Sequence, residues 1–99
     1  MVVGVCRLTL SIAEGYSLKD KRRVVKSLVE RVHNRFNVAV AEVDHHEIWN
    51  SAVLGVACVS TAGAHAEAVL ASVVTFVEGG ATRGEIEVVD ATTEILPGF

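Results

Sequence analysis

The chain has 99 residues, of which 51% are hydrophobic and 21% charged, with a formal net charge of −3. This length accommodates one hydrophobic core but not two, and the composition excludes a disordered chain. No apolar run approaches the ~20 residues needed to span a membrane, and the N-terminal MVVGVCRLTL lacks the basic start of a signal peptide. We therefore expect a single domain over residues 1–99, in the cytoplasm and without membrane contact.

Residues 2–12 are predicted to form a strand because apolar and polar side chains alternate with a period of two. Cys6, Leu8 and Leu10 fall on one face of that strand. Val3 and Val5 fall on the other. A loop, AEGYS, follows it.

A helix is predicted over residues 18–36. Ser17 stands three residues before Asp20, which resembles a capping box with Asp in the acidic position. The apolar stripe recurs at spacings of three and four, apart from one two-turn gap, and consists of Leu18, Val25, Leu28, Val29, Val32 and Phe36. Lys21 falls near this stripe, so we expect its aliphatic stem to run along the edge of the core and its ammonium group to reach solvent.

The remaining pattern predicts two strands, a second helix and a final strand. Residues 37–43 and 51–61 read as strands joined by the polar tip DHHEIWN, and residues 85–96 as the last strand. Residues 63–79 read as a helix that ends at Gly79-Gly80, with a buried face of Ala66, Val69, Leu70, Val73, Val74 and Val77. A loop, ATRG, precedes the last strand.

The order β-α-β-β-α-β predicts an α+β, ferredoxin-like fold. This fold is a four-stranded antiparallel sheet with both helices on one face. The first and third strands are then central neighbours, and Cys6 and Cys58 both face the helices as buried, reduced thiols.

The charge is divided unevenly along the chain. The segment from Leu18 to Phe36 holds seven basic and two acidic residues, a net charge of +5. The rest holds two basic and ten acidic residues, a net charge of −8. Such a division affects the electrostatic potential at the protein surface and the choice of binding partners, and it does not bear on the fold.

The basic segment has two interpretations, a phosphate-binding surface or a solvated helix face. In the first, the contacts to phosphate are made by Lys19, Arg22, Arg23, Lys26 and Arg31, with Arg35 secondary. Basic residues in the first turns oppose the helix dipole, and an anion at that helix end would be favoured by both dipole and side chains. In the second, the charges simply keep the helix solvated.

Base stacking on the sheet is not expected. Many ferredoxin-like domains stack RNA bases on aromatic residues of the central strands, and residues 2–12 and 51–61 contain none. Trp49, beside the hairpin tip, is either a plug over the edge of the core or an exposed contact residue.

The sequence gives no sign of catalysis, metal or cofactor. There is no GxSxG, P-loop or GxGxxG motif, and no CxxC or zinc spacing. The four consecutive residues from Asp44 to Glu47 are of metal-ligand types, but adjacent residues point apart and seldom converge on one ion. We therefore expect a non-enzymatic protein without metal or cofactor.

The face of the sheet away from the helices is predicted to be apolar for a surface, with partner-binding residues Val3, Val5, Val53, Ala57 and Val59 on the sheet and Trp49 at the tip. An aliphatic patch of this kind suggests self-association or a protein partner. The long last strand offers an edge for pairing with a second copy. We therefore expect a homodimer.

Three stretches, SLKDKRRVVKSL, RFNVAVAEVDHHEIWNSAVLGVACVS and IEVVD, resemble the small bacterial YlxP-like family, also called DUF503. The resemblance covers nearly the whole chain and implies a ferredoxin-like fold. Genes of this family lie among translation and ribosome-maturation genes, which implies a cytoplasmic role around RNA or ribosomes. The family motif maps onto Lys19, Lys21, Arg22 and Arg23, with Glu42 and Asp44 on the hairpin side, and it carries no catalytic residue.

Two functions follow as hypotheses. The first is an accessory protein that docks on structured RNA, such as ribosomal RNA or a ribosomal particle, through the basic helix. The alternative is a protein-interaction or small-ligand-binding homodimer that uses the open sheet face.

Overall fold

The computed structural model describes residues 1–13, 17–79 and 84–99. The elements follow the predicted order: β1 Val2–Ile12, α1 Leu18–Arg35, β2 Ala39–Asp44, β3 Ser51–Ser60, α2 Gly63–Gly79 and β4 Ile86–Leu96. The expected loop around Tyr16, the stop at Gly80 and most of the ATRG loop lie outside the described residues. The order and boundaries confirm the ferredoxin-like prediction.

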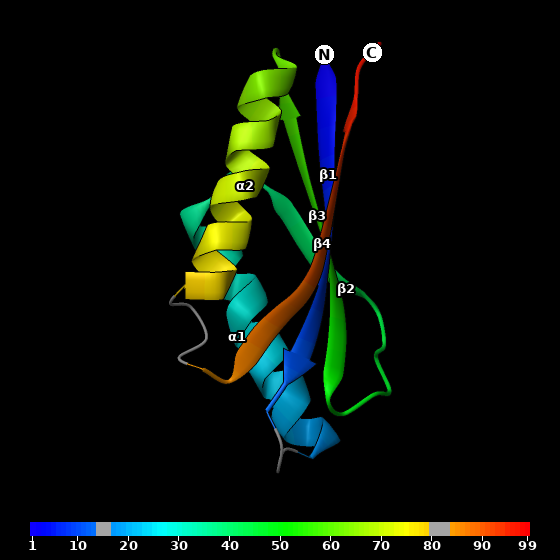
Figure 1. Ribbon diagram of the computed structural model, residues 1–99, viewed down its shortest axis with the longest axis vertical. Helices are drawn as coiled ribbons and strands as arrows, with labels where there is room; N and C mark the ends of the chain where they lie inside the picture. The colour runs from blue at the N-terminus through cyan, green and yellow to red at the C-terminus, as the bar shows by residue number, and fades with distance from the viewer. Residues whose placement is uncertain (14–16, 80–83) are drawn as a thin grey trace.

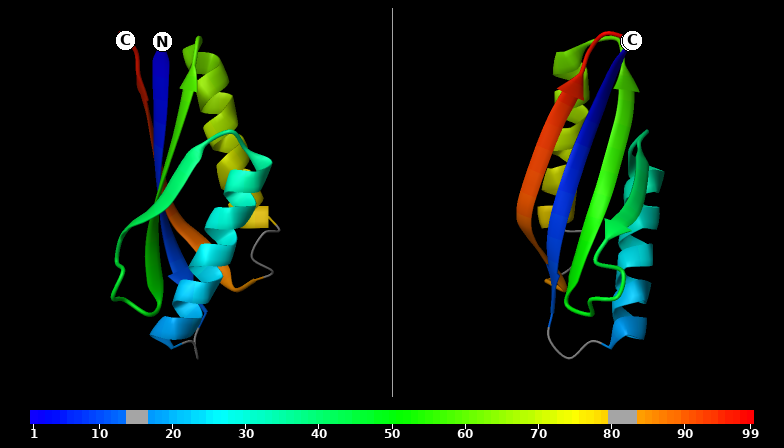
Figure 2. Two further views of the ribbon diagram at one scale, coloured as in Figure 1. Left: turned by 180° about the vertical axis from the view of Figure 1, so that it is seen from behind. Right: turned by 90° about the vertical axis from the view of Figure 1, so that its right-hand side faces the viewer.

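The four strands form one antiparallel sheet in the order β2-β3-β1-β4. As predicted, β1 and β3 are the central neighbours. Both helices pack on the same face of the sheet (Figures 1 and 2). Both termini lie at one end of the sheet, while the start of α1 and the connection between β2 and β3 lie at the other (Figure 1).

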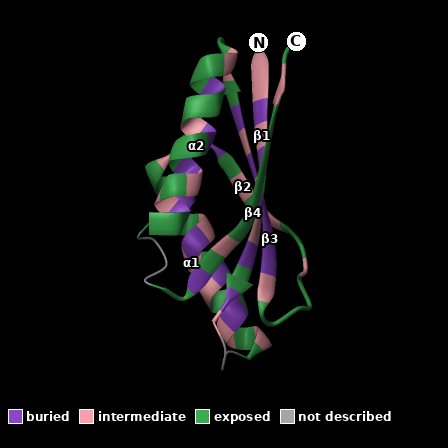
Figure 3. Ribbon diagram, viewed as in Figure 1, coloured by how far each residue is buried: buried purple, intermediate pink, exposed green. Residues whose placement is uncertain are grey.

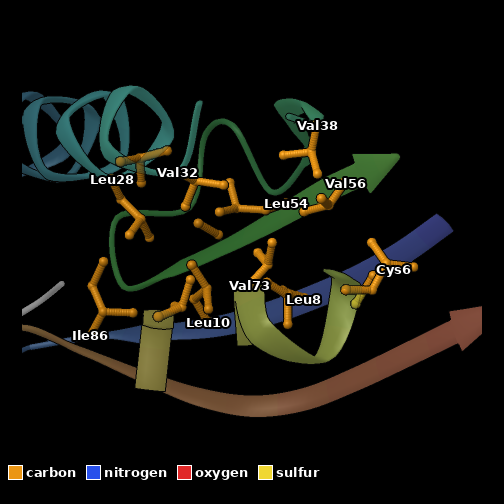
Figure 4. Packing of buried hydrophobic residues seen from close by; sticks show 14 of the residues in the cluster. Cys6, Leu8, Leu10, Leu28, Val32, Val38, Leu54, Val56, Val73 and Ile86 are labelled. Atoms are coloured by element: carbon orange, nitrogen blue, oxygen red, sulfur yellow. The ribbon is translucent and has the colours of Figure 1, made fainter. Parts of the chain in front are cut away.

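The core lies between the sheet and the helices (Figure 4). Alternation along β1 sends Cys6, Leu8 and Leu10 into it, and Leu54 and Val56 of β3 point the same way. Burying apolar surface of this kind contributes roughly 25 cal/mol per Å² to folding. Cys6 and Cys58 are buried free thiols on the helix side, which confirms their predicted placement.

Helix α1 begins with the predicted capping box. The backbone N–H of Asp20 donates to Ser17 Oγ (3.1 Å), and the backbone N–H of Ser17 donates to Asp20 Oδ2 (3.3 Å). These two bonds satisfy donors that have no partner within the helix. At the other end, Phe36 packs edge to face on Phe76 of α2, with ring centroids 5.6 Å apart.

Both edge strands carry a β-bulge. Val43 of β2 and Val89 of β4 lie where the pairing register shifts, so neither has a partner residue on the neighbouring strand. Both side chains are exposed. Figure 3 shows β4 as exposed along most of its length. A bulge increases the local twist of an edge and hinders pairing with another chain.

Neither described helix is long and apolar enough to cross a membrane.

Candidate nucleic-acid interface

Three exposed cations form a line along α1. Lys19, Arg22 and Lys26 follow one another at spacings of three and four residues, so they lie on one side of the helix. We call these three residues the basic row. All three side chains are exposed, and together they cover about 10 Å of the helix axis.

Of the other two predicted phosphate contacts, Arg23 flanks the basic row and Arg31 lies away from it. Arg31 comes nine residues after Arg22, about two and a half turns, which puts it on the opposite side of α1. Arg31 and Arg23 both line a small hollow of about 230 Å³, which Glu85 and Ile86 also line. Arg23 therefore lies between the basic row and Arg31.

The ion pairs of these cations are long and solvated. Arg22 Nη2 lies 3.5 Å from Glu47 Oε1, with side chains 58% and 81% exposed, and Arg23 Nη1 lies 3.9 Å from Asp20 Oδ1. Lys19 and Lys26 form no ion pair with any residue that the structure describes. Exposed pairs of this length contribute about 0–1 kcal/mol, so the basic row can exchange them for phosphate at little cost.

Lys21 differs from its basic neighbours because its side chain is fully buried. Its Nζ donates to the backbone carbonyl of His45 (2.7 Å) and lies 3.4 Å from that of His46. It also lies 2.8 Å from Glu42 Oε2. This carboxylate oxygen is buried and accepts no well-aligned hydrogen bond, so its negative charge is compensated by the ion pair with Lys21. We call this arrangement the lysine clamp.

The sequence interpretation of Lys21 was wrong, since an ammonium group at the core edge was expected to reach solvent. Lys21 fills the two-turn gap in the apolar stripe, four residues before the buried Val25. Glu42 likewise continues the core-facing alternation of Val38 and Val40. A cation and an anion that both interrupt apolar patterns were the signal that could have identified this pair.

The hairpin tip, residues 45–50, is ordered by short-range hydrogen bonds. His45 has a positive φ of 61°, an uncommon conformation outside glycine. Its N–H donates to Asp44 Oδ1 (2.8 Å), its ring Nδ1 lies 2.9 Å from Ser51 Oγ, and its carbonyl accepts from the N–H of Ile48 (3.0 Å). The bond from His45 is also the main cause that holds the pKa of Asp44 below its ordinary value.

Trp49 is 43% exposed and is not part of the core cluster. Of the two interpretations left open by the sequence, the plug over the edge of the core is therefore wrong, and a contact role for Trp49 stays a prediction. Ile48, its neighbour in the tip, is 41% exposed. The tip thus presents two large apolar side chains to solvent beside the start of α1.

The open sheet face carries the predicted aliphatic residues on β1 and β3, with one correction. Val59 is 68% exposed, and Val3, Val5 and Ala57 are half-buried. Val53 is fully buried, so its expected part in a partner surface is wrong. Val53 pairs with Asp44, where the hairpin tip begins, and the tip leaves the sheet on the side away from the helices (Figure 1).

A groove of about 700 Å³ lies on this face. Its floor consists of small residues in register across the two strands, Ala39 opposite Ala57 and Ala41 opposite Gly55. Val43 leans over Gly55, where an added Cβ would lie 2.9 Å from Val43 Cγ1. Arg7 and Asp44, 3.5 Å apart and both largely exposed, also line the groove.

Comparison with known proteins places the chain in a family. Residues 3–93 match the family described as "Protein of unknown function (DUF503)". Over 77 residues the chain is 32% identical to the "Uncharacterized protein YlxP" of Bacillus subtilis (strain 168). The aligned region covers 78% of this chain and 84% of that protein.

A solved structure agrees in fold alone. A putative chlorite dismutase superimposes with a TM-score of 0.53 at 12% identity, over 96% of this chain. This chain spans 44% of the length of that protein. The match over residues 3–93 and the identity with YlxP together show that the chain belongs to the DUF503 family of proteins of unknown function.

Proposed function

We propose that this protein is a non-enzymatic accessory protein that docks on structured RNA, such as a ribosomal particle, through phosphate contacts from the basic row. The observation that carries the proposal is the line of exposed Lys19, Arg22 and Lys26 on one side of α1, in a chain whose remainder is strongly acidic. The resemblance to a family whose genes lie among translation genes supports the same choice.

The contact is expected along the side of α1 and not at its end. Ser17 already occupies the backbone N–H of Asp20, and Asp20 supplies the negative charge that a helix N-terminus favours. The Ser17 hydroxyl, followed by its backbone N–H, holds the pKa of Asp20 below its ordinary value. This contribution to stability is present above the ordinary pKa and is lost as the pH falls below it.

Reversing one charge of the basic row should weaken RNA binding. We expect Lys26→Glu to lower the affinity for ribosomal RNA about tenfold and to reduce the slope of log K against log salt by about 1 or more. The measurement is binding of purified protein to ribosomal subunits and free ribosomal RNA over a range of salt concentrations.

Arg31→Glu is the matched control, because it changes the net charge equally on the opposite side of α1. We expect Arg31→Glu to have the smaller effect. Equal losses in both variants would show a dependence on net charge only, and wild-type affinity in Lys26→Glu would contradict the proposal. Thermal melts of both variants verify that they remain folded.

A second candidate function is self-association through the open sheet face. It rests on a different observation, the groove of Ala39, Ala41, Gly55 and Ala57 beside the exposed Val59. A twofold axis would place the protruding valine of each copy over the small residues of the other, as an isologous interface requires.

A carboxylate in the groove should then separate the two copies. We expect Ala57→Glu to raise the dissociation constant of the dimer by at least about tenfold, because a charge would be desolvated without a partner. Ala68→Glu, on the exposed face of α2, is the control and should change nothing. Sedimentation velocity over a range of protein concentrations measures the difference, and a wild-type protein that stays monomeric throughout would exclude this candidate.

A further inference from the structure

We infer that the hairpin tip is the second half of the RNA site and that an unpaired base of the RNA stacks on the indole ring of Trp49, while the basic row holds the adjoining phosphates. This inference rests on the proposed function and deepens it. It names the class of ligand, which is single-stranded or looped RNA and not a continuous duplex.

The tip and the basic row form one continuous surface. The lysine clamp connects the backbone carbonyls of His45 and His46 to α1 through a side chain with no solvent exposure. A second contact joins the same two elements at the surface, where Arg22 Nη2 of the basic row lies 3.5 Å from Glu47 Oε1 of the tip. Residues more than twenty positions apart in the sequence are therefore held side by side, close to the start of α1.

Burying an ammonium group is expensive unless it is fully compensated, and a buried ion pair is weak evidence of a gain in stability. The specific effect of Lys21 is to hold the tip in place against α1, because both carbonyls that its ammonium group binds belong to the tip. The positive φ of His45 and its bond to Asp44 fix the same turn. The tip is therefore held in one conformation beside the basic row before any ligand arrives.

Within residues 17–79 and 84–99, the exposed aromatic ring at this place is that of Trp49. Among the aromatic residues that the structure describes, Phe36 and Phe76 are half-buried and pack on each other. Phe99 is exposed but lies at the C-terminus, at the opposite end of the sheet from the tip (Figure 1). The central strands carry no aromatic residue, so any base stacking must take place off the sheet.

An exposed ring on a loop that contacts a row of exposed cations has the chemistry of single-stranded nucleic-acid binding. A base of any identity has a π-face that can stack on an aromatic ring, and nearby cations hold the backbone that connects successive bases. In a duplex those faces are covered by neighbouring base pairs. The exposed contact of Arg22 with Glu47 is weak enough to open in favour of a phosphate oxygen.

The experiment uses the fluorescence of Trp49, which is the only tryptophan in the chain. The full-length protein is titrated at low salt with an oligoadenylate of about twelve nucleotides, within the site sizes of single-strand binders, and separately with the same strand paired to its complement. We expect the single strand to quench the emission and the duplex to leave it largely unchanged.

Two variants extend the test by an independent binding measurement such as fluorescence anisotropy of labelled RNA. We expect Trp49→Ala to weaken binding of the single strand about five- to a hundredfold, and Trp49→Phe, which keeps an aromatic face, to restore most of it. Because Trp49 is exposed and outside the core cluster, neither change should unfold the protein.

The outcomes distinguish base stacking from phosphate docking. If binding falls in Lys26→Glu but Trp49 is not quenched and Trp49→Ala binds normally, stacking is overturned and phosphate docking stands. If neither the oligonucleotides nor ribosomal RNA and subunits bind at low salt, both are overturned. If Trp49→Ala keeps its affinity for RNA but loses its affinity for ribosomal particles, Trp49 contacts a protein, and the inference is again wrong.

Discussion

Replacing Lys21 by methionine should lower the free energy of unfolding by about 3–5 kcal/mol, the usual cost of removing one partner from a buried ion pair. The loss arises because Glu42 Oε2 would stay buried without its cation, and because the carbonyls of His45 and His46 would lose their donor. Urea denaturation followed by far-ultraviolet circular dichroism measures the change. Lys19→Met, an exposed site two residues away in the same helix, should change stability by no more than about 0.5 kcal/mol.

The double variant Lys21→Met/Glu42→Leu distinguishes the ion pair from the hydrogen bonds to the carbonyls. Replacing both members of a buried pair by apolar side chains is often neutral, so we expect the double variant to recover most of the loss. It should remain about 1–2 kcal/mol less stable than the wild type because the two carbonyls still lack a donor. A double variant no more stable than Lys21→Met would show that the loss arises from the two carbonyls, and not from the unpaired carboxylate of Glu42.

Leu70→Ala should destabilise the protein by about 2–5 kcal/mol, because the fully buried side chain on α2 would leave a cavity against the sheet. The structure also identifies a compensating change. A Cβ added at Gly4 would lie 3.0 Å from Leu70 Cδ1 and 3.2 Å from both Ala66 Cβ and Cys58 Sγ. Gly4→Ala alone should therefore destabilise by about 1 kcal/mol or more through crowding.

In the Leu70→Ala background, the same Gly4→Ala change should become stabilising, since the atom nearest to the new methyl group is gone. We expect a favourable coupling of about 0.5–3 kcal/mol between the two positions, measured as a double-mutant cycle by urea denaturation. Additive effects of the two changes would mean that α2 moves toward β1 when Leu70 is truncated and refills the space itself. Thr75→Ala, on the exposed side of α2, is the control for helix propensity.

Most of the fold could be predicted from the sequence because its signals are local. The alternation of Cys6, Leu8 and Leu10, the Ser17–Asp20 capping box and the apolar stripes of both helices each depend on residues a few positions apart. Once six elements stand in the order β-α-β-β-α-β, few topologies remain in which every apolar face is covered.

The site was predicted only in part. The helical period alone places Lys19, Arg22 and Lys26 in a row and sends Arg31 to the opposite side, so this division was available in the sequence. The exposure of Trp49 could not be predicted from the sequence, because a tryptophan beside a hairpin tip can either cover the edge of the core or stay in solvent. The exposure depends on how the tip leaves the sheet.

The elements, their order and the place where positive charge gathers follow from the amino-acid sequence, because backbone periodicity and capping depend on residues a few positions apart. The side-chain contacts across the fold arise only when the elements pack together. This packing buries Lys21 against Glu42 and the carbonyls of the tip, removes Val53 from the open face and brings Glu47 beside Arg22. These contacts join residues far apart in the chain, and each depends on the register of β2 on β3 and on the bulge at Val43. A shift of one residue in that register would turn Glu42 to the other face of the sheet, away from Lys21.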